Sequence, residues 1–547
     1  MTTETLPAPD ADHAPTTDRY DAIVIGAGPA GLYELYLLRQ KGLDVRVIEA
    51  GSGVGGTWYW NRYPGCRLHS ESVTYQYFFS EEMLAHWDWS EVFAGQPELE
   101  RYFDKVADIY DLRRDIEFET RVVSMTFDED TDDWTLVTDT GKTFTAHVVV
   151  SATGMLSAPI YPDVPGRESF RGEAYHTARW PKDEVSFANK KVVVVGTGSS
   201  GVQIIPQIAA TADHLTVLMR TPNWVIPLNN RAIEQDELTD LRTRWPELHE
   251  KLKNTTGGFL HDVDPTPTTS YSPEELLERY EKAWAGTGFT KWFGMPVDVL
   301  TDEKANRHFA EFIAEKVRRR LADPKIADLL IPQHLYGVKP VECESGNYYE
   351  VYNQDNVELV PVAQDPIQEI TPTGIRTGSR EIDADVIVFA TGFEAFVGAL
   401  NRIEITGVGG RTLRKNWADG PETYLGVQVA GFPNLFMIGG PHGKGGHGNS
   451  PRCAEGPLEW IADLTEKITT ESIKRVEPDP RAQAEWTKHV YETGNASFVA
   501  KGKSYLFGDN VPGRKRAYVA YIGSLPEFVS RLRTVAANDY EGFVITR

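Results

Sequence analysis

Two glycine-rich runs in the sequence have the residue types and spacing that bind the phosphates of dinucleotides. The first follows an apolar run at residues 20–25 and precedes a helical pattern at residues 32–41. Backbone amides and the positive end of that helix can therefore meet a pyrophosphate, although a merely tight turn is the alternative. The next apolar run, residues 45–48, ends in a carboxylate that can accept hydrogen bonds from ribose hydroxyls. The residues concerned are Gly26, Gly28, Gly31 and Glu49.

The second run repeats this pattern after the apolar residues 191–195. Here the following strand pattern, residues 215–219, ends in Arg220 and Thr221 rather than in an acid. An arginine can bind a 2′-phosphate with two parallel hydrogen bonds, whereas a carboxylate repels it, so this site predicts NADPH, with NADH possible. An ordinary surface arginine is the alternative. The other residues predicted for this site are Gly196, Gly198, Ser199, Gly201 and Gln203.

Two nucleotide sites with different partners predict that hydride passes from a nicotinamide to a second bound cofactor, which is most simply FAD at the first site. A disulfide reductase would use the same pair of sites, but it needs a redox pair of cysteines. Cys66, Cys343 and Cys453 lie far apart and show no CxxC spacing, which also argues against a metal site. Oxygen is therefore the leading electron acceptor.

Composition excludes several other classes of protein. The chain has 547 residues and a net charge of −23, so a general nucleic-acid or anionic-membrane surface is not expected. Residues 1–18 lack the basic start and apolar stretch of a signal peptide, and no later segment has the roughly 18 apolar residues that span a bilayer. These features predict a cytoplasmic protein without nucleic-acid or membrane partners, and they indicate no particular oligomeric state.

The two motifs must be positioned by an α/β fold with two Rossmann-type dinucleotide-binding domains. Between residues 223 and 334 charged helical patterns replace the strand patterns, which predicts a helical insertion in the NADPH domain. Ser272, followed by proline and two glutamates, indicates one helix start in it. The predicted division is a flexible tail at 1–18, the FAD domain at 19–154 and 388–547, and the NADPH domain at 155–222 and 335–387, with the insertion at 223–334 between its two parts.

Residues 170–181 match the pattern FxGxxxHxxxWP, and with it the chain resembles the type I Baeyer–Villiger monooxygenases, of which cyclohexanone monooxygenase is one. Residues 55–58, 62–65 and 389–393 resemble further blocks of that family. The resemblance implies a linker that couples NADPH binding to domain movement, although a buried structural histidine remains an equal alternative. It also implies that Gly56, Thr57 and Trp58 contact FAD and that Tyr505 covers the nicotinamide. The linker residues are Phe170, Gly172, His176 and Trp180.

The resemblance implies that a C4a-peroxyflavin inserts one atom of O2 next to a ketone carbonyl, giving an ester or lactone. Relatives place an arginine and an aspartate at the flavin, where this chain has Lys339 and His69. We hypothesise that Lys339 stabilises the negative peroxide and contacts the nicotinamide, and that His69, which titrates near neutrality, orients Lys339 or relays a proton. These departures resemble type II flavin-containing monooxygenases, so oxygenation of nitrogen or sulfur is an alternative. A flavin- and NADPH-binding sensor that oxygenates nothing is a third.

Overall fold

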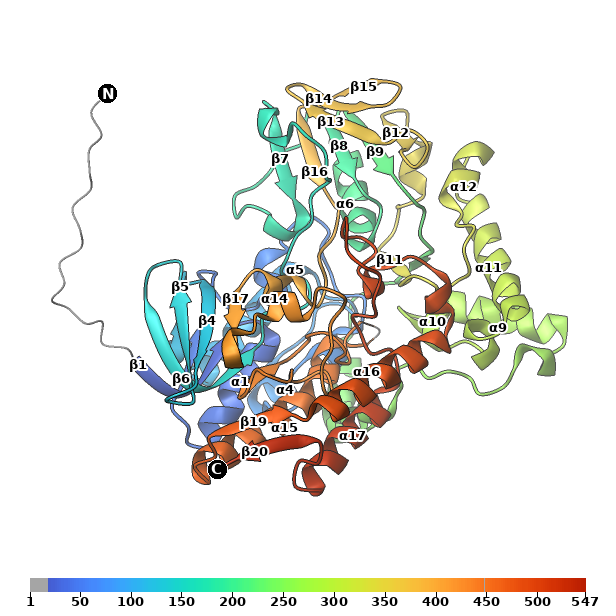
Figure 1. The fold of residues 1–547 in the computed structure, drawn as a ribbon. Coiled ribbons are helices and arrows are strands. Elements are labelled where there is room, and N and C mark those ends of the chain that lie inside the picture. The colour runs from blue at the N-terminus through green and yellow to red at the C-terminus, as the bar shows by residue number, and fades with distance from the viewer. Residues whose placement is uncertain (1–17, 447) are drawn as a thin grey trace, which may run out of the picture.

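The computed structural model describes residues 18–446 and 448–547. The predicted tail at residues 1–18 lies outside this part of the chain, apart from Asp18, which begins the first strand. Figure 1 shows two α/β units, one above the other, with a group of helices beside them and the C-terminal helices beneath. Because chain segments from both ends build the lower unit, β1 and β18 belong to one sheet although some 400 residues separate them.

The lower unit is an eight-stranded sheet with the order β17-β4-β5-β6-β1-β2-β3, and β18 also pairs with β6. The strands from β6 to β3 run parallel, as expected where a helix crosses from one strand to the next, whereas β4 and β5 form antiparallel hairpins. The strands are β1 Asp18–Ile25, β2 Val45–Ile48, β3 Ile116–Glu117, β4 Val122–Asp128, β5 Asp133–Thr138, β6 Thr143–Ser151, β17 Glu404–Thr406 and β18 Leu435–Met437.

The upper unit is a five-stranded parallel sheet with the order β12-β9-β8-β16-β7. Its strands are β7 Glu173–His176, β8 Lys191–Val195, β9 His214–Met219, β12 Val357–Pro361 and β16 Val386–Phe389. The predicted α/β fold with two Rossmann-type units is therefore confirmed. The predicted domain boundary at residue 388 falls inside β16, which pairs with β8 through Phe389, so the chain leaves this sheet only after that residue. A three-stranded antiparallel sheet, β13 Ile367–Thr371, β14 Gly374–Thr377 and β15 Glu381–Asp383, follows β12.

The glycines of both motifs are required by close contacts between strand and helix. A Cβ on Gly31, in α1, would lie 1.8 Å from the carbonyl oxygen of Gly26. A Cβ on Gly201, in α6, would lie 2.3 Å from the carbonyl oxygen of Gly196. The first glycine of each motif has a positive φ, +104° and +110°, which glycine adopts at little cost. The two helices are α1 Pro29–Gln40 and α6 Ser199–Ala209.

Helices fill the part of the chain that the sequence assigns to an insertion. The predicted start at Ser272 is a capping box, in which Ser272 and Glu275 satisfy each other's backbone amides. In α11 the apolar side chains of Phe309, Ile313 and Val317 are buried. The parallel strands β10 Val225–Pro227 and β11 Glu342–Glu344 pair at the base of these helices. The helices are α7 Gln235–Thr243, α8 Trp245–Asn254, α9 Pro273–Ala285, α10 Thr290–Phe293, α11 Glu303–Arg318 and α12 Pro324–Leu330.

Helix α15, Ser450–Thr470, packs along α1, the helix that follows the first motif. In the described residues we find no helix that is long and apolar enough to cross a membrane. The remaining elements are α2 Thr57–Trp60, α3 Ser72–Tyr75, α4 Glu81–His86, α5 Gln96–Ile109, α13 Gly398–Asn401, α14 Leu413–Asn416, α15 Ser450–Thr470, α16 Pro480–Asn495, α17 Leu525–Ala537, and the antiparallel pair β19 Arg475–Pro478 and β20 Phe543–Thr546.

Candidate active site

A single cavity of about 1280 Å³ contacts both glycine-rich motifs. It is large enough for extended ligands such as dinucleotides, and polar groups of the motifs line it together with apolar side chains. The predicted site residues that line it are Gly26, Gly28, Glu49, Gly56, Thr57, Trp58, His69, Gly196, Gly198, Ser199, Gln203, Arg220, Thr221, Lys339 and Tyr505. Gly31 and Gly201 lie behind it, at the strand contacts described above. The structure thus brings residues from both sheets to one place.

The first motif presents a surface suited to a dinucleotide. Each oxygen of the Glu49 carboxylate accepts a backbone hydrogen bond, from Ala27 N at 2.7 Å and from Gly51 N at 2.6 Å, which fixes it at the end of β2. Burial raises the pKa of Glu49, while these amides and nearby arginines oppose the shift. A Cβ on Gly56 would lie 2.7 Å from the Cα of Gly28. The predicted FAD-contacting block therefore packs directly on the phosphate-binding turn.

The second motif has cations and one acid beside it. Arg220 is exposed at the end of β9, and Lys339 lies on the segment that leads into β11. Burial lowers the pKa of Lys339, and the positive charge of Arg220 lowers it further, whereas Glu342 acts in the opposite direction. Arg220 and Lys339 repel each other, and an anionic ligand bound between them would stabilise both charges. The two cations therefore suit the 2′-phosphate of NADPH.

His69 contacts the second unit through an amide rather than through Lys339. Nε2 of Gln203, in α6, lies 2.8 Å from Nε2 of His69, and Oε1 of Gln203 accepts a hydrogen bond from the Tyr63 hydroxyl at 2.8 Å. Since the amide donates to the imidazole, that ring nitrogen carries no proton. Burial lowers the pKa of His69 to about 4, and the nearby charge of Arg67 adds to this. The prediction that His69 titrates near neutrality is therefore wrong, because sequence alone does not show its burial.

The linker residues Phe170, Gly172, His176 and Trp180 lie outside the cavity lining, whereas Arg179 of the same fingerprint lines it. His176 Nδ1 accepts a hydrogen bond from Ala178 N at 3.0 Å, and its Nε2 lies 3.1 Å from the carbonyl oxygen of Ile160. A Cβ on Gly172 would lie 2.3 Å from the carbonyl oxygen of Asp385, next to β16. Burial lowers the pKa of His176 to about 4, so it is neutral. The fingerprint thus joins the crossing segment near Ile160 to the upper sheet.

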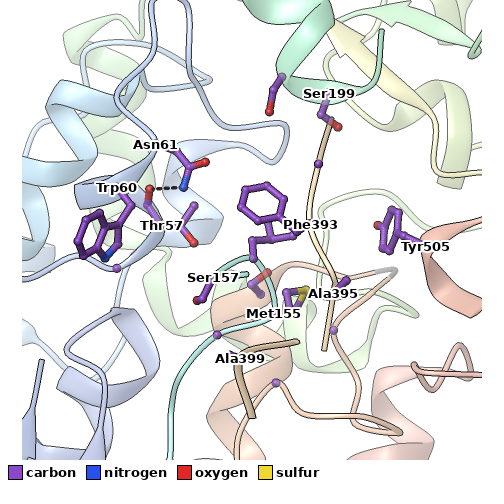
Figure 2. A pocket seen from close by; sticks show the side chains of 18 of the residues that line it. Thr57, Trp60, Asn61, Met155, Ser157, Ser199, Phe393, Ala395, Ala399 and Tyr505 are labelled. Carbon is purple, nitrogen blue, oxygen red and sulfur yellow. Dashed lines mark hydrogen bonds between the residues drawn. The ribbon is translucent and has the colours of Figure 1, made fainter. Parts of the chain in front are cut away.

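An apolar part of the cavity lies between the two motifs. Figure 2 shows Phe393 near its centre, with Thr57 and Asn61 on one side and Tyr505 on the other, and with Met155 and Ser157 below. Tyr505 begins the short helix Tyr505–Phe507, so an aromatic side chain does face the cavity at the predicted position.

Sequence reasoning missed several residues of the lining. Phe259 and Phe289 come from the helical insertion, and Phe289 packs edge-on against His69 with ring centroids 6.3 Å apart. Arg179 lies in the fingerprint at residues 170–181, and Phe393 lies in the block at residues 389–393. Their positions in these motifs could have indicated that they line the cavity. Glu342 gave a weaker signal, because it is a strand residue three positions after Lys339.

Two dinucleotide motifs around one cavity, with free cysteines at the described positions 66, 343 and 453, define a two-cofactor oxidoreductase that works without a disulfide. Comparisons with known proteins give the class more closely. Residues 23–257 match the family described as pyridine nucleotide-disulphide oxidoreductase. Acetone monooxygenase (methyl acetate-forming) from Gordonia sp. (strain TY-5) is 40% identical over 97% of this chain and 100% of its own length.

Phenazine N-monooxygenase from Lysobacter antibioticus is 40% identical over 96% of this chain and 97% of its own. A solved structure of the OTEMO complex with FAD and NADP superposes with a TM-score of 0.93 at 40% identity, covering 97% of this chain and 100% of that one. The chain belongs to the Baeyer–Villiger monooxygenase family of flavoproteins, as its resemblance to cyclohexanone monooxygenase predicts.

Proposed function

We propose that this chain uses NADPH, FAD and O2 to insert one oxygen atom next to the carbonyl group of a small-molecule ketone, giving an ester or a lactone. The observation that carries the proposal is the cavity in which both dinucleotide motifs meet. When bound, FAD supplies the chemistry of oxygen transfer and NADPH supplies the two electrons. Relatives that share about 40% identity over nearly the whole chain include a monooxygenase that forms methyl acetate from acetone.

The residues of the chain bind and orient the cofactors. The turn at Gly26–Gly28 leads into the start of α1, where the helix dipole suits the FAD phosphates. Glu49 is held in place by the amides of Ala27 and Gly51, and its remaining lone pairs suit the ribose hydroxyls. Gly198 and Ser199 present the amino-terminal end of α6 to the phosphates of NADPH. Arg220 and Lys339 both line the cavity beside this motif, and two neighbouring cations suit its 2′-phosphate.

The substrate binds against the apolar wall. Phe259 and Phe289 close the cavity on the side of His69, and aromatic walls exclude water from a reacting carbonyl. His69 is held neutral, so it orients the substrate or the cofactor by hydrogen bonding and does not supply positive charge. For Lys339 to act as the catalytic cation, its ammonium group must also reach the flavin. Its position next to Arg220 argues against this.

Oxygenation of nitrogen is the second candidate, and one specific observation favours it. The phenazine N-monooxygenase is as similar to this chain as the acetone monooxygenase. Flat aromatic substrates also suit a wall made of Phe259, Phe289 and Phe393.

The experiment is turnover of the FAD-loaded protein with NADPH under ¹⁸O2, with a cyclic ketone, a thioether and a phenazine offered separately. One ¹⁸O atom in a lactone establishes the proposed reaction. Label only in an N-oxide or a sulfoxide establishes the alternative. Flavin reduction followed by release of hydrogen peroxide alone, with every substrate, would identify a non-oxygenating sensor. NADH in place of NADPH, in the same assay, tests the choice of coenzyme.

The cysteines support a location in the cytoplasm. Cys66, Cys343 and Cys453 are buried free thiols, which suits a reducing compartment. The net charge of −23 supports a small-molecule substrate rather than nucleic acid as the partner.

A further inference from the structure

Glu342 lies at the amino-terminal end of α6, where the phosphates of the coenzyme are expected. It is 7% exposed, begins β11 and lines the cavity. Its carboxylate accepts a hydrogen bond from the Ser199 hydroxyl and one from Asn223 Nδ2 at 3.0 Å. A carboxylate group of the protein itself thus takes the hydroxyl donor of the first residue of this helix.

This hydroxyl lies where a dinucleotide places its phosphates. Ser199 directly follows Gly198 in the second motif, and this end of a helix, with its amides and its dipole, is what binds pyrophosphate. One hydroxyl proton cannot be donated to a carboxylate and to a phosphate oxygen at once. Two anions placed there together would also repel each other strongly, because the site is buried. The carboxylate must therefore move away or become neutral when the coenzyme binds.

We propose that Glu342 is an internal anion that competes with the coenzyme phosphates for Ser199, so that NADP binding neutralises it with uptake of a proton. The proposal rests on the binding of NADP at the second motif. The proton comes from solvent and is held on the carboxyl group of Glu342 while the coenzyme is bound. Coenzyme affinity is then set partly by pH, through a residue that need not contact the flavin.

The surroundings of Glu342 determine the sign of this effect. Burial raises its pKa to about 7, while Ser199, Asn223 and the charge of Lys339 act in the opposite direction. A phosphate beside the carboxyl group favours its neutral form and raises the pKa further. Binding therefore takes up a proton at pH values above about 7, and affinity falls as pH rises. The titratable groups that face it are Lys339 on its own segment, Cys343 in β11, Tyr63, Tyr348 and Tyr505.

The test is the dissociation constant of NADP⁺ with the FAD-loaded protein, followed through the flavin absorbance between pH 6 and pH 8.5. The 2′-phosphate of NADP⁺ itself titrates near pH 6, so the informative quantity is the ratio of the constants for the natural protein and Glu342→Gln at each pH. We expect this ratio to be small at pH 6 and to grow by up to about tenfold per pH unit above pH 7, with the variant binding more tightly.

A matched control is Glu344→Gln, two positions along β11. Glu344 is also buried, but it pairs with Arg320 instead of with α6, so this variant should keep the pH dependence of the natural protein. A second readout needs no variant. Calorimetry of NADP⁺ binding at pH 8 in two buffers of different ionisation enthalpy should show net proton uptake by the natural protein.

Parallel pH profiles for the natural protein and Glu342→Gln, or binding at pH 8 without proton uptake, would overturn the proposal. Weaker binding by Glu342→Gln at every pH, with an unchanged slope, would overturn it as well and make Glu342 a structural cap of α6. Absence of NADP⁺ binding at any pH would instead refute the assignment of the second motif, and the two failures are thus distinguishable.

Discussion

The neighbouring cations Arg220 and Lys339 predict how the chain selects NADPH over NADH. If both cations bind the 2′-phosphate, then Arg220→Ala and Lys339→Met should each weaken NADP⁺ binding and leave NAD⁺ binding nearly unchanged, because NAD⁺ lacks that group. A hydrogen bond to a charged group contributes about 1.5–3 kcal/mol, and every 1.4 kcal/mol is tenfold in affinity. Arg220 is exposed whereas Lys339 is partly buried. We therefore expect about tenfold for Arg220→Ala and up to about a hundredfold for Lys339→Met.

The assay is titration of the FAD-loaded protein with NADP⁺ and NAD⁺ at one fixed low ionic strength. The double variant adds a test of proximity, since two groups that bind the same phosphate are coupled and the losses should not add. Lys325→Met is the control, because Lys325 is exposed on α12 and lies outside the cavity lining. Equal losses for NADP⁺ and NAD⁺ in Lys339→Met, accompanied by faster release of hydrogen peroxide during turnover, would refute the reasoning. That result would indicate that Lys339 acts at the flavin as a catalytic cation and does not bind the 2′-phosphate.

Three further outcomes follow from buried groups. Among the residues that the structure describes, neither carboxylate oxygen of Glu34, in α1, has a hydrogen-bond partner, and burial raises the pKa of Glu34 well above its usual value. The stability of the natural protein relative to Glu34→Gln should therefore fall above about pH 4.5, by up to about 1.4 kcal/mol per pH unit, as thermal midpoints at pH 6 and pH 8 will show. Gln203→Leu leaves the partners Tyr63 and His69 unsatisfied, at about 1–3 kcal/mol each, which denaturant unfolding measures. Gly31→Ala should give protein without bound flavin, checked by its absorbance spectrum, because its Cβ meets the preceding strand.

Much of the fold was readable because its signals are local. The two glycine runs, the apolar runs before them and the capping box at Ser272 each involve a few neighbouring residues, and the structure has a strand or helix at each. Electrostatic properties were not readable in this way. The hydrogen bond between Ser199 and Glu342 joins positions 143 residues apart, and the burial that makes His69 neutral comes from α6 and from Phe289 in the insertion. Such contacts depend on how the units pack, which one sequence does not display.

The packing of the units gives α6 two roles. Its amino-terminal end lines the cavity at Gly198 and Ser199, and its side face contacts the turn that carries Tyr63, Gly65 and His69 from the lower unit. A Cβ on Gly65 would lie 2.6 Å from the carbonyl oxygen of Gln203, so this turn meets the helix backbone directly. A displacement of α6 would therefore move His69 as well, so this contact couples the second motif to the lower unit. Since burial keeps His69 neutral, the contact between the units depends on hydrogen bonding and packing and not on an ion pair.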